Sequence, residues 1–497
     1  MSDELLLGFD VGTSSVKAAV FSLDGTPAGF ATAVIPLQRP GDGLCEVDPR
    51  AYWQGLGECC RMLAGEGVGL PRVRALSISA HAETLIPVDE DLEPVRPAIV
   101  WVDTRSTREA AELVARFGTE ELASRSGQPL MIPMWPATKL LWLQNHEPDL
   151  AVGVRWWLQP LDYLVAKMTG EIASDASEYS SSLLLDIRTR RWWQPMLDEL
   201  GISERVLPEL REAGSPIGRL RAEAAAELGL GEALVVMGGF DQACTAVGAG
   251  NVREGVVSES TGSSLAAITT IREPPARGSA VPCHVHVVGD HYFLDAHSPT
   301  AGAAYSWLRD QLGNELSFSE LDALAATVAP GSDGLLLLPW LAGTATPSFD
   351  PMARGVLFGL SLDHGRGHLA RATLEGVAFE LNALLDASRM VGSAPRELRS
   401  VGGGAKSALW SQIKADVTAL PVSVPVIADY AGALGAAILA AVGADVFPTI
   451  EVCADALVSI DRTYVPDPAA CERYAQARAL HQRLSSRLDG LFGGAQA

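Results

Sequence analysis

The chain has 497 residues, 48% of them hydrophobic, with 48 Gly and 30 Pro, which predicts a globular protein of more than one domain. A net charge of -22 and a pI of about 4.8 oppose nonspecific attraction to nucleic acid or to an anionic membrane surface, so neither partner is expected. The 7 Cys are scattered without CxxC spacing, and the acidic start MSDELLLGFD does not fit a signal peptide. Both features are typical of a cytoplasmic protein with reduced thiols.

The first elements are two apolar runs, residues 5–9 and 16–21, which predict a β-hairpin. The loop between them, DVGTSSVK, carries a carboxylate, three hydroxyls, a glycine and a lysine. This combination suits a phosphate and its metal, because the glycine lets backbone N–H groups face a ligand. An ordinary polar turn uses the same residue types for conformational reasons, so the loop alone leaves both interpretations open.

The next elements are strands with polar residues at their ends, in ALSISAHAETLIPVDE and PAIVWVDTR. From residue 109 to about residue 147 the apolar spacing becomes helical, through ATKLLWLQNHEP. A second series of strands and loops starts near residue 235 with VVMGGFDQACTAVGAG, followed by GVVSESTGSSLAAITT. This last stretch again breaks an apolar strand at a Ser/Thr/Gly loop, as the opening does, and favours a duplicated unit.

The carboxyl-terminal part alternates between long helices and glycine loops. DHGRGHLARATLEGVAFELNALLDASRM predicts a long amphipathic helix, with Asp363 or a neighbour as its cap. LRSVGGGAKSALWSQIKADV predicts a strand, a glycine loop and a helix that begins near Ser407, a geometry that lets a helix amino terminus approach a nucleotide. After about residue 465 a surface helix is expected.

Taken in order, these segments resemble the FGGY family of carbohydrate kinases, within the superfamily that shares the hexokinase and actin ATPase fold. MWPATKLLWLQNH, LPWLAGTATPSFDPMARGVLFGLSLDH and ALGAAILAAVG add to the similarity, which spans most of the chain. The resemblance implies an α/β fold of two ribonuclease-H-like domains with the active site in the cleft between them. Residues 1–252 would form the amino-terminal domain, residues 253–464 the carboxyl-terminal nucleotide-binding domain and residues 465–497 a helical extension.

The resemblance also implies an ATP-dependent kinase that uses Mg²⁺. Asp241 would be the general base that takes the proton of the sugar hydroxyl, and Asp10 would hold the metal directly or through water. The residues that would bind the nucleotide are Asp10, Gly12, Thr13, Ser14 and Lys17 in the first phosphate loop, Thr261, Gly262 and Ser263 in the second, and Gly403, Gly404 and Ala405 against the adenosine. The usual Gly-Thr pair of the second loop reads Gly262-Ser263 here, which keeps a hydroxyl.

The substrate pocket departs from the family patterns. Xylulose kinases read Gln-Met-His-Gly and glycerol kinases Gln-Arg-Glu-Thr where this chain has His81-Ala82-Glu83-Thr84. The substrate-binding residues that the resemblance implies are His81, Glu83, Trp101, Asp103, Asp241 and Gln242. The expected acceptor is a ketopentose such as xylulose, with ribulose, erythrulose, erythritol and glycerol left open, and a homodimer is expected because family members are often dimers.

Two other patterns indicate alternative functions. Gly365, Gly367 and Ala370 match the loosest form of the dinucleotide-binding fingerprint, which motivates an NAD-linked dehydrogenase, although no acidic strand end follows about 20 residues further on. His284 and His286 share one face of a predicted strand, but no zinc-module spacing completes a metal site. A sugar sensor without activity is disfavoured because Asp10 and Asp241 are both present.

Overall fold

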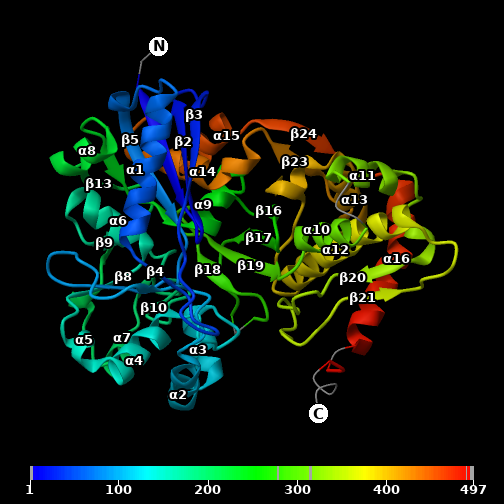
Figure 1. Cartoon of the computed structure of the whole chain (residues 1–497), viewed down its shortest axis with the longest axis horizontal. Helices are drawn as coiled ribbons and strands as arrows, with labels where there is room; N and C mark the ends of the chain where they lie inside the picture. The colour runs from blue at the N-terminus through cyan, green and yellow to red at the C-terminus, as the bar shows by residue number, and fades with distance from the viewer. Residues whose placement is uncertain (1–3, 277–278, 313–315, 489, 493–497) are drawn as a thin grey trace. The chain divides into compact units, whose positions relative to one another are not determined.

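The computed structural model describes residues 4–276, 279–312, 316–488 and 490–492, which form two compact units (Figure 1). Unit 1 comprises Met1–Val252, Ile271–Phe293 and Tyr430–Val458, and unit 2 comprises Arg253–Thr270, Leu294–Asp429 and Ser459–Ala497. One break between the units falls between Val252 and Arg253. The segments 271–293 and 430–458, expected in the second domain, instead make their contacts in unit 1, because a chain joins the unit that buries its apolar face.

Unit 1 is built on a seven-stranded sheet that contains the predicted hairpin. Its strand order is β13 (Pro216–Arg219), β14 (Leu234–Val236), β5 (Val73–Ala80), β1 (Leu5–Val11), β2 (Ser15–Ser22) and β3 (Pro27–Val34), and β15 (Gly239–Phe240) also pairs with β5. β1 and β2 are antiparallel, while β1 and β15 both run parallel to β5. β1 and β5 are buried almost throughout, as their continuous apolar runs require of a parallel pair covered on both faces.

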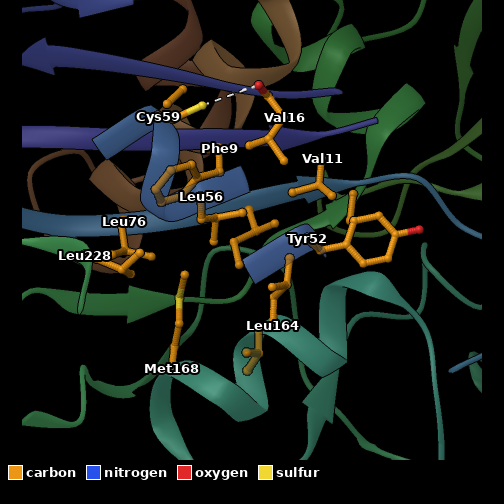
Figure 2. Packing of buried hydrophobic residues seen from close by; sticks show 14 of the residues in the cluster. Phe9, Val11, Val16, Tyr52, Leu56, Cys59, Leu76, Leu164, Met168 and Leu228 are labelled. Atoms are coloured by element: carbon orange, nitrogen blue, oxygen red, sulfur yellow. Dashed lines mark hydrogen bonds between the residues drawn. The ribbon is translucent and has the colours of Figure 1, made fainter. Parts of the chain in front are cut away.

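The core of unit 1 lies between this sheet and the helices α1 (Arg50–Gly65) and α6 (Pro160–Thr169). Figure 2 shows side chains from the strands and the helices that interlock there, among them Phe9, Val11, Leu76, Tyr52, Leu56, Leu164 and Met168. The thiol of Cys59 in α1 donates to the backbone carbonyl of Val16 at 3.4 Å and so links the helix to β2 (Figure 2).

Glycines bring α14 (Ala431–Gly443) unusually close to β1 and to α9 (Asp241–Gly248). A Cβ atom on Gly8 would lie 1.8 Å from the carbonyl oxygen of Ala433, and one on Gly435 would lie 1.9 Å from that of Cys244. These backbone contacts leave no room for a side chain. The Ala/Gly-rich run at residues 431–443 therefore serves close packing of a helix against the strand and helix that carry the candidate acidic residues.

The region expected to be helical from residue 109 to 147 is helical but interrupted. It contains α2 (Thr107–Phe117), α3 (Thr119–Ser126), α4 (Pro136–His146) and α5 (Pro148–Val152). Gly118 and Gly127 end α2 and α3 with positive φ angles, and Pro136 begins α4. The remaining elements of unit 1 are β4 (Glu46–Val47), β6 (Ile86–Val88), β7 (Ala98–Ile99), β8 (Trp156–Leu158), β9 (Ala173–Ser174), β10 (Leu185–Asp186), β11 (Arg191–Trp192), α7 (Gln194–Glu199), β12 (Glu209–Leu210), α8 (Ala222–Leu228) and α15 (Ile450–Leu457).

Unit 2 repeats the strand pairing of unit 1. The second seven-stranded sheet has the order β18 (Cys283–Val285), β19 (Tyr292–Ser298), β17 (Leu265–Ile271), β16 (Val256–Thr261), β22 (Glu397–Val401), β23 (Val422–Pro425) and β24 (Ile460–Tyr464). β16, β22, β23 and β24 belong wholly to unit 2, whereas β18 lies in the segment 271–293 assigned to unit 1. β16 forms an antiparallel hairpin with β17 and runs parallel to β22, just as β1 pairs with β2 and β5. The echo between the two sequence stretches therefore corresponds to the same local topology.

The helices of unit 2 are α10 (Gly302–Gln311), α11 (Phe318–Ala326), α12 (Arg366–Met390), α13 (Ala408–Thr418) and α16 (Pro468–Leu488), with a separate pair of strands, β20 (Leu336–Leu338) and β21 (Val356–Phe358). α13 begins as predicted, since the Ser407 hydroxyl accepts from the Trp410 backbone N–H at 3.0 Å. Of the predicted caps of α12, Asp363 or a neighbour, Asp363 itself is not the cap. That helix begins after Gly365, whose N–H donates to Nδ1 of His368 at 3.1 Å.

No helix in the described parts of the chain is both long enough and apolar enough to cross a membrane.

Replacing Gly435 by Ala is expected to destabilise the protein by about 1–3 kcal/mol, because the added methyl group meets the Cys244 carbonyl. Gly65→Ala is the matched control: this helical glycine has nothing within 4 Å of the position that a Cβ would take, so alanine there is expected to stabilise by about 0.5–1 kcal/mol. Thermal unfolding midpoints of the two variants measure the difference. Equal midpoints would contradict the close packing of α14 on α9.

Candidate active site

The first set of candidate residues lies at one edge of the sheet of unit 1. Asp10 is the last residue but one of β1, and its strand neighbour Ser79 in β5 is also the neighbour of Gly239 in β15. Because these three strands run parallel, their carboxyl ends meet at the same edge, as expected for the ligand-binding edge of an α/β sheet. Glu83 follows β5, and Asp241 begins α9, the helix directly after β15.

Asp10 is held at the base of the hairpin loop. The hydroxyl of Ser79 donates to its Oδ1 at 2.9 Å, and Lys17 stands opposite it in the hairpin register. Burial raises the pKa of Asp10 above its ordinary value, and Lys17 and Ser79 partly offset this rise. A Cβ on Gly432 would lie 2.7 Å from Oδ1, so the glycine leaves the space that the carboxylate occupies.

The loop itself is accessible to a ligand. Gly12 and Thr13 are partly exposed and Ser14 is exposed, while the Gly12 N–H closes the turn by donating to the Ser15 carbonyl at 2.9 Å. The Lys17 ammonium lies 5.8 Å from the ring centroid of Tyr430. The indole N–H of Trp101 donates to the Thr13 hydroxyl at 2.8 Å, which joins the phosphate-loop candidates to a substrate-pocket candidate.

Glu83 is fixed on three sides in a left-handed conformation with φ of 66°. Its backbone N–H donates to Gln159 Oε1, its carbonyl accepts from the Lys139 ammonium at 2.7 Å, and its Oε1 accepts from the Ser181 hydroxyl. A non-glycine residue in this region is strained by about 1–3 kcal/mol and persists only where its surroundings enforce it. Burial lowers the pKa of Lys139 to about 7, although the nearby Glu83 carboxylate favours its charged form.

His81 and Asp103 are brought to this edge, but their polar atoms are engaged within unit 1. His81 is buried, with Nε2 3.2 Å from the Tyr52 hydroxyl, and burial lowers its pKa to about 4, so it is neutral near pH 7. Asp103 accepts from the Cys45 N–H at 2.6 Å and from the Arg105 guanidinium at 2.8 Å. Burial raises the pKa of Asp103, but these bonds outweigh it and leave the pKa below its ordinary value.

Gln242 and Asp241 remain partly exposed in the first turn of α9. The N–H of Phe240, just before them, donates to the Ser177 hydroxyl at 3.0 Å and ties this turn to the segment 174–182. Asp241, Gln242, Glu83 and Trp101 are thus the members of the predicted set that keep access to a ligand at this edge.

Glu178 lies among these acids and carried no signal in the sequence, where SDASEYSSS matches no motif. Neither of its carboxylate oxygens has a hydrogen-bond partner among the described residues, and both are buried. Burial raises its pKa well above the ordinary value, and the nearby charges of Asp162, Asp241 and Glu83 raise it further. Burial thus disfavours the charged form of the Glu178 carboxyl group, and the backbone carbonyl of Glu178 accepts from Gln159 Nε2 at 3.0 Å.

The second set of candidates lines a cavity of about 920 Å³ that lies within unit 2. Its walls come from the β16–β17 turn, α10, α11 and residues 403–410, and they include Thr261, Gly262, Ser263, Gly403 and Gly404. Ala405 is buried and is not among the lining residues. Aromatic and small side chains such as Tyr305, Phe318, Ala326 and Trp410 complete a wall suited to a flat apolar ligand group.

Glycines bring the segments of this cavity together. A Cβ on Gly302 would lie 2.3 Å from the Gly262 carbonyl oxygen, and one on Gly404 would lie 2.6 Å from Cγ2 of Thr261. A Cβ on Gly403 would meet nothing within 4 Å. The Gly403 position therefore faces open space, while Gly302 and Gly404 are needed for close approach of the backbone.

The described residues contain no group of three or more His, Cys, Asp or Glu side chains arranged to hold a metal ion. The Mg²⁺ expected from the sequence would not need such a group, because Mg²⁺ usually binds through one or two carboxylates together with substrate phosphates and water. Asp10, next to the space left by Gly432, would supply one such carboxylate.

Comparison with known proteins identifies the class to which this fold and these residues belong. The amino-terminal domain model of the FGGY family of carbohydrate kinases matches residues 5–248, and the carboxyl-terminal domain model matches residues 257–444. The protein is thus a phosphotransferase with an alcohol group as acceptor. The chain belongs to the FGGY family of carbohydrate kinases.

Three relatives illustrate the similarity. The xylulose kinase of Escherichia coli (strain K12) is 32% identical over 487 residues, covering 97% of this chain and 99% of that protein. The glycerol kinase of Trichlorobacter lovleyi is 34% identical over 451 residues, covering 88% and 89%. The crystal structure of xylulose kinase from Rhodospirillum rubrum superposes with a TM-score of 0.90 at 29% identity and covers 99% of this chain and 100% of that one.

These matches confirm the two-domain fold and a sugar kinase, so the NAD-linked dehydrogenase is wrong. The structure gives the physical reason. Gly365 and Gly367 stand at the start of α12, and the preceding strand, β21, pairs with the antiparallel β20 in a sheet of two strands among the described residues. The fingerprint needs a strand of a parallel βαβ unit, which this position lacks.

The titration of Asp162 tests how burial changes the pKa of a carboxyl group near the site. It accepts from the Tyr179 hydroxyl at 2.7 Å and from the Gln159 N–H at 3.1 Å, and burial raises its pKa to about 7. The native state therefore keeps a proton that the unfolded chain releases above about pH 4, and stability falls as pH rises towards 7, by up to about 1.4 kcal/mol per pH unit.

Asparagine does not titrate, so Asp162→Asn does not suffer this loss of stability as pH rises. Thermal midpoints measured from pH 4.5 to 7.5 are expected to show the variant gaining on the wild-type protein as pH rises. Parallel curves for the two proteins would show that Asp162 titrates normally.

Proposed function

We propose that the protein is an ATP-dependent kinase that transfers the γ-phosphate of MgATP to a hydroxyl of a ketopentose such as xylulose. The observation that carries this proposal is the meeting of Asp10, Glu83 and Asp241 at the ends of three parallel segments of unit 1. It is supported by relatives named xylulose kinases that match nearly the whole chain.

Asp241 suits the role of general base, because a partly exposed carboxylate at a helix start is placed to accept a proton from an acceptor hydroxyl. As the proton passes to Asp241, the hydroxyl oxygen forms its bond to the γ-phosphorus and the bond from that phosphorus to the β–γ bridging oxygen breaks. ADP leaves, the phosphate ester remains, and Asp241 returns the proton to water. This transfer depends mainly on alignment and on neutralised charge.

Bound Mg²⁺ would neutralise phosphate charge, and Asp10 would hold it directly or through water. The residues of this chain would do the rest of the positioning. Lys17 and the backbone at Thr13 and Ser14 would face the phosphates, while Gly403, Gly404 and the aromatic wall of the unit 2 cavity would hold the adenosine. The exposed Ser263 would supply the hydroxyl of the second phosphate loop.

The acceptor would be read by Glu83, Gln242 and Trp101. Glu83 accepts from Ser181, and its carboxylate is a group that can accept several hydrogen bonds, as polyol hydroxyls require. The pair Glu83-Thr84 agrees with the glycerol kinase pattern, and one relative is named a glycerol kinase, so glycerol, erythritol, erythrulose and ribulose form the second candidate set. A cytoplasmic location and a homodimer stay predictions from the sequence.

The proposal is tested by measuring ADP release with MgATP across ketoses, aldoses and alditols. The highest rate is expected with a ketopentose. In Asp241→Asn, kcat is expected to fall about 10²–10⁴-fold with little change in KM, because the variant keeps its shape but loses the base. Full activity of this variant would mean that Asp241 is not the base, and no ADP release with any acceptor would overturn the proposal.

Glu83→Gln is expected to raise KM for the acceptor about tenfold or more, since a charged hydrogen-bond acceptor is lost, while KM for ATP stays unchanged. Glu121→Gln, which changes an exposed carboxylate on α3 that pairs with Arg125, is the control and should leave both constants unchanged. An equal rise in both KM values for Glu83→Gln would instead indicate a general disturbance of unit 1.

A further inference from the structure

Unit 2 contains an ion pair that is completely buried directly beneath its cavity. The ammonium of Lys414 in α13 lies 2.6 Å from Oε1 of Glu259 in β16, and neither side chain has any exposed surface. The Ser400 hydroxyl of β22 donates to the same oxygen. Removing two charges from water costs several kcal/mol per ion, so such a pair persists only where hydrogen bonds satisfy both groups.

The third member of this network is Thr261, which lines the cavity. Its hydroxyl accepts from the Lys414 ammonium at 2.8 Å and donates to Oε2 of Glu259 at 2.8 Å. Both of these hydrogen bonds are made with side chains buried inside unit 2. The Thr261 side chain therefore acts below the loop, and only its backbone is left to meet a phosphate.

The same network reaches the opposite walls of the cavity. The side chain of Thr261 packs against Gly404, where a Cβ would come within 2.6 Å of it. Lys414 also lies 5.2 Å from the ring centroid of Trp410, a cavity wall whose own N–H donates to the Leu374 carbonyl at 3.0 Å. One lysine thus connects the end of β16, the loop after β22 and the first turn of α13.

We propose that Glu259 and Lys414 are positioning residues for nucleotide binding: by fixing the Thr261 side chain between Lys414 and Gly404, they hold the turn at residues 261–263 and the loop at residues 402–404 as facing walls of one cavity. This inference rests on the proposed function, in which that cavity takes ATP. It assigns to the Thr261 hydroxyl an internal role in place of a contact with phosphate.

Substitution of both residues can separate a role of the pair in stability from a role in nucleotide binding. Replacing a buried ion pair by apolar residues of similar volume is often neutral or stabilising, whereas removing one partner leaves an unpaired charge. The double variant Glu259→Leu/Lys414→Met is therefore expected to keep unit 2 folded, while it removes the polar anchor of Thr261 and the partner of the Ser400 hydroxyl. Its thermal midpoint is expected to equal or exceed that of the wild-type protein.

The binding of ADP with Mg²⁺, measured by calorimetry, is expected to weaken about tenfold or more in this double variant, and KM for ATP should rise while KM for the acceptor stays constant. Thr261→Val should weaken ADP binding similarly, and adding it to the double variant should cause little further loss, because one anchor is removed in both. Thr261→Ser, which keeps the hydroxyl, should bind ADP about as tightly as the wild-type protein.

A folded double variant that binds ADP as tightly as the wild-type protein would overturn the inference. If the double variant does not fold, the pair of Thr261→Val and Thr261→Ser decides the question alone, since equal ADP affinities in these two would also overturn it. Additive losses from Thr261→Val and the double variant would contradict a shared anchor.

A second buried pair in unit 2 provides the control. Arg371 and Glu375 of α12 lie 2.7 Å apart, both bond the Tyr474 hydroxyl, and neither lines the cavity. Arg371→Met/Glu375→Leu should leave ADP affinity unchanged, and an equal loss there would overturn the special role of Glu259 and Lys414. A wild-type protein that binds no ADP would instead contradict the proposed function itself.

Discussion

The parallel pairing of β1 and β15 with β5 is the constraint on which the acidic site depends. Parallel neighbours share one carboxyl edge, so a single sheet register sets the places of Asp10, Glu83 and Asp241 together. The pairing in turn requires cover on both faces of the sheet, because parallel strands are stable when buried. α14 supplies part of that cover and can approach closely only because Gly8 and Gly435 have no side chains.

Neutral hydroxyl groups donate hydrogen bonds to the carboxylates at this edge. Ser79 bonds Asp10, and Ser181 bonds Glu83. Hydroxyl groups satisfy the carboxylate oxygens without cancelling their charge, so the site keeps its attraction for a metal or a cationic group. Burial then raises the pKa values of Asp10 and Glu178, which makes protonation at this edge sensitive to what binds there.

The two units use the same hairpin and parallel-strand pattern for different chemistry. In unit 1, the end of β1 carries Asp10 next to Ser79 of the paired strand, with Lys17 across the hairpin. In unit 2, the end of β16 carries Thr261, and the charges of Glu259 and Lys414 are buried beneath it and paired with each other. Charge is thus available for chemistry in the first unit and is used for positioning in the second.

The sequence by itself determined the two hairpins, the start of α13 at Ser407 and the family, because these depend on local periodicity, turn chemistry and the order of motifs. The tertiary structure decided which side chains meet: Lys414 with Glu259, Ser181 with Glu83, and Glu178 with the acids around it. It also bonded Asp103 to Arg105 and Cys45, and joined residues 430–458 to unit 1. Lys414 and Glu259 are 155 residues apart and Ser181 and Glu83 are 98 apart, so these pairs leave no local pattern, since packing and burial alone bring them together.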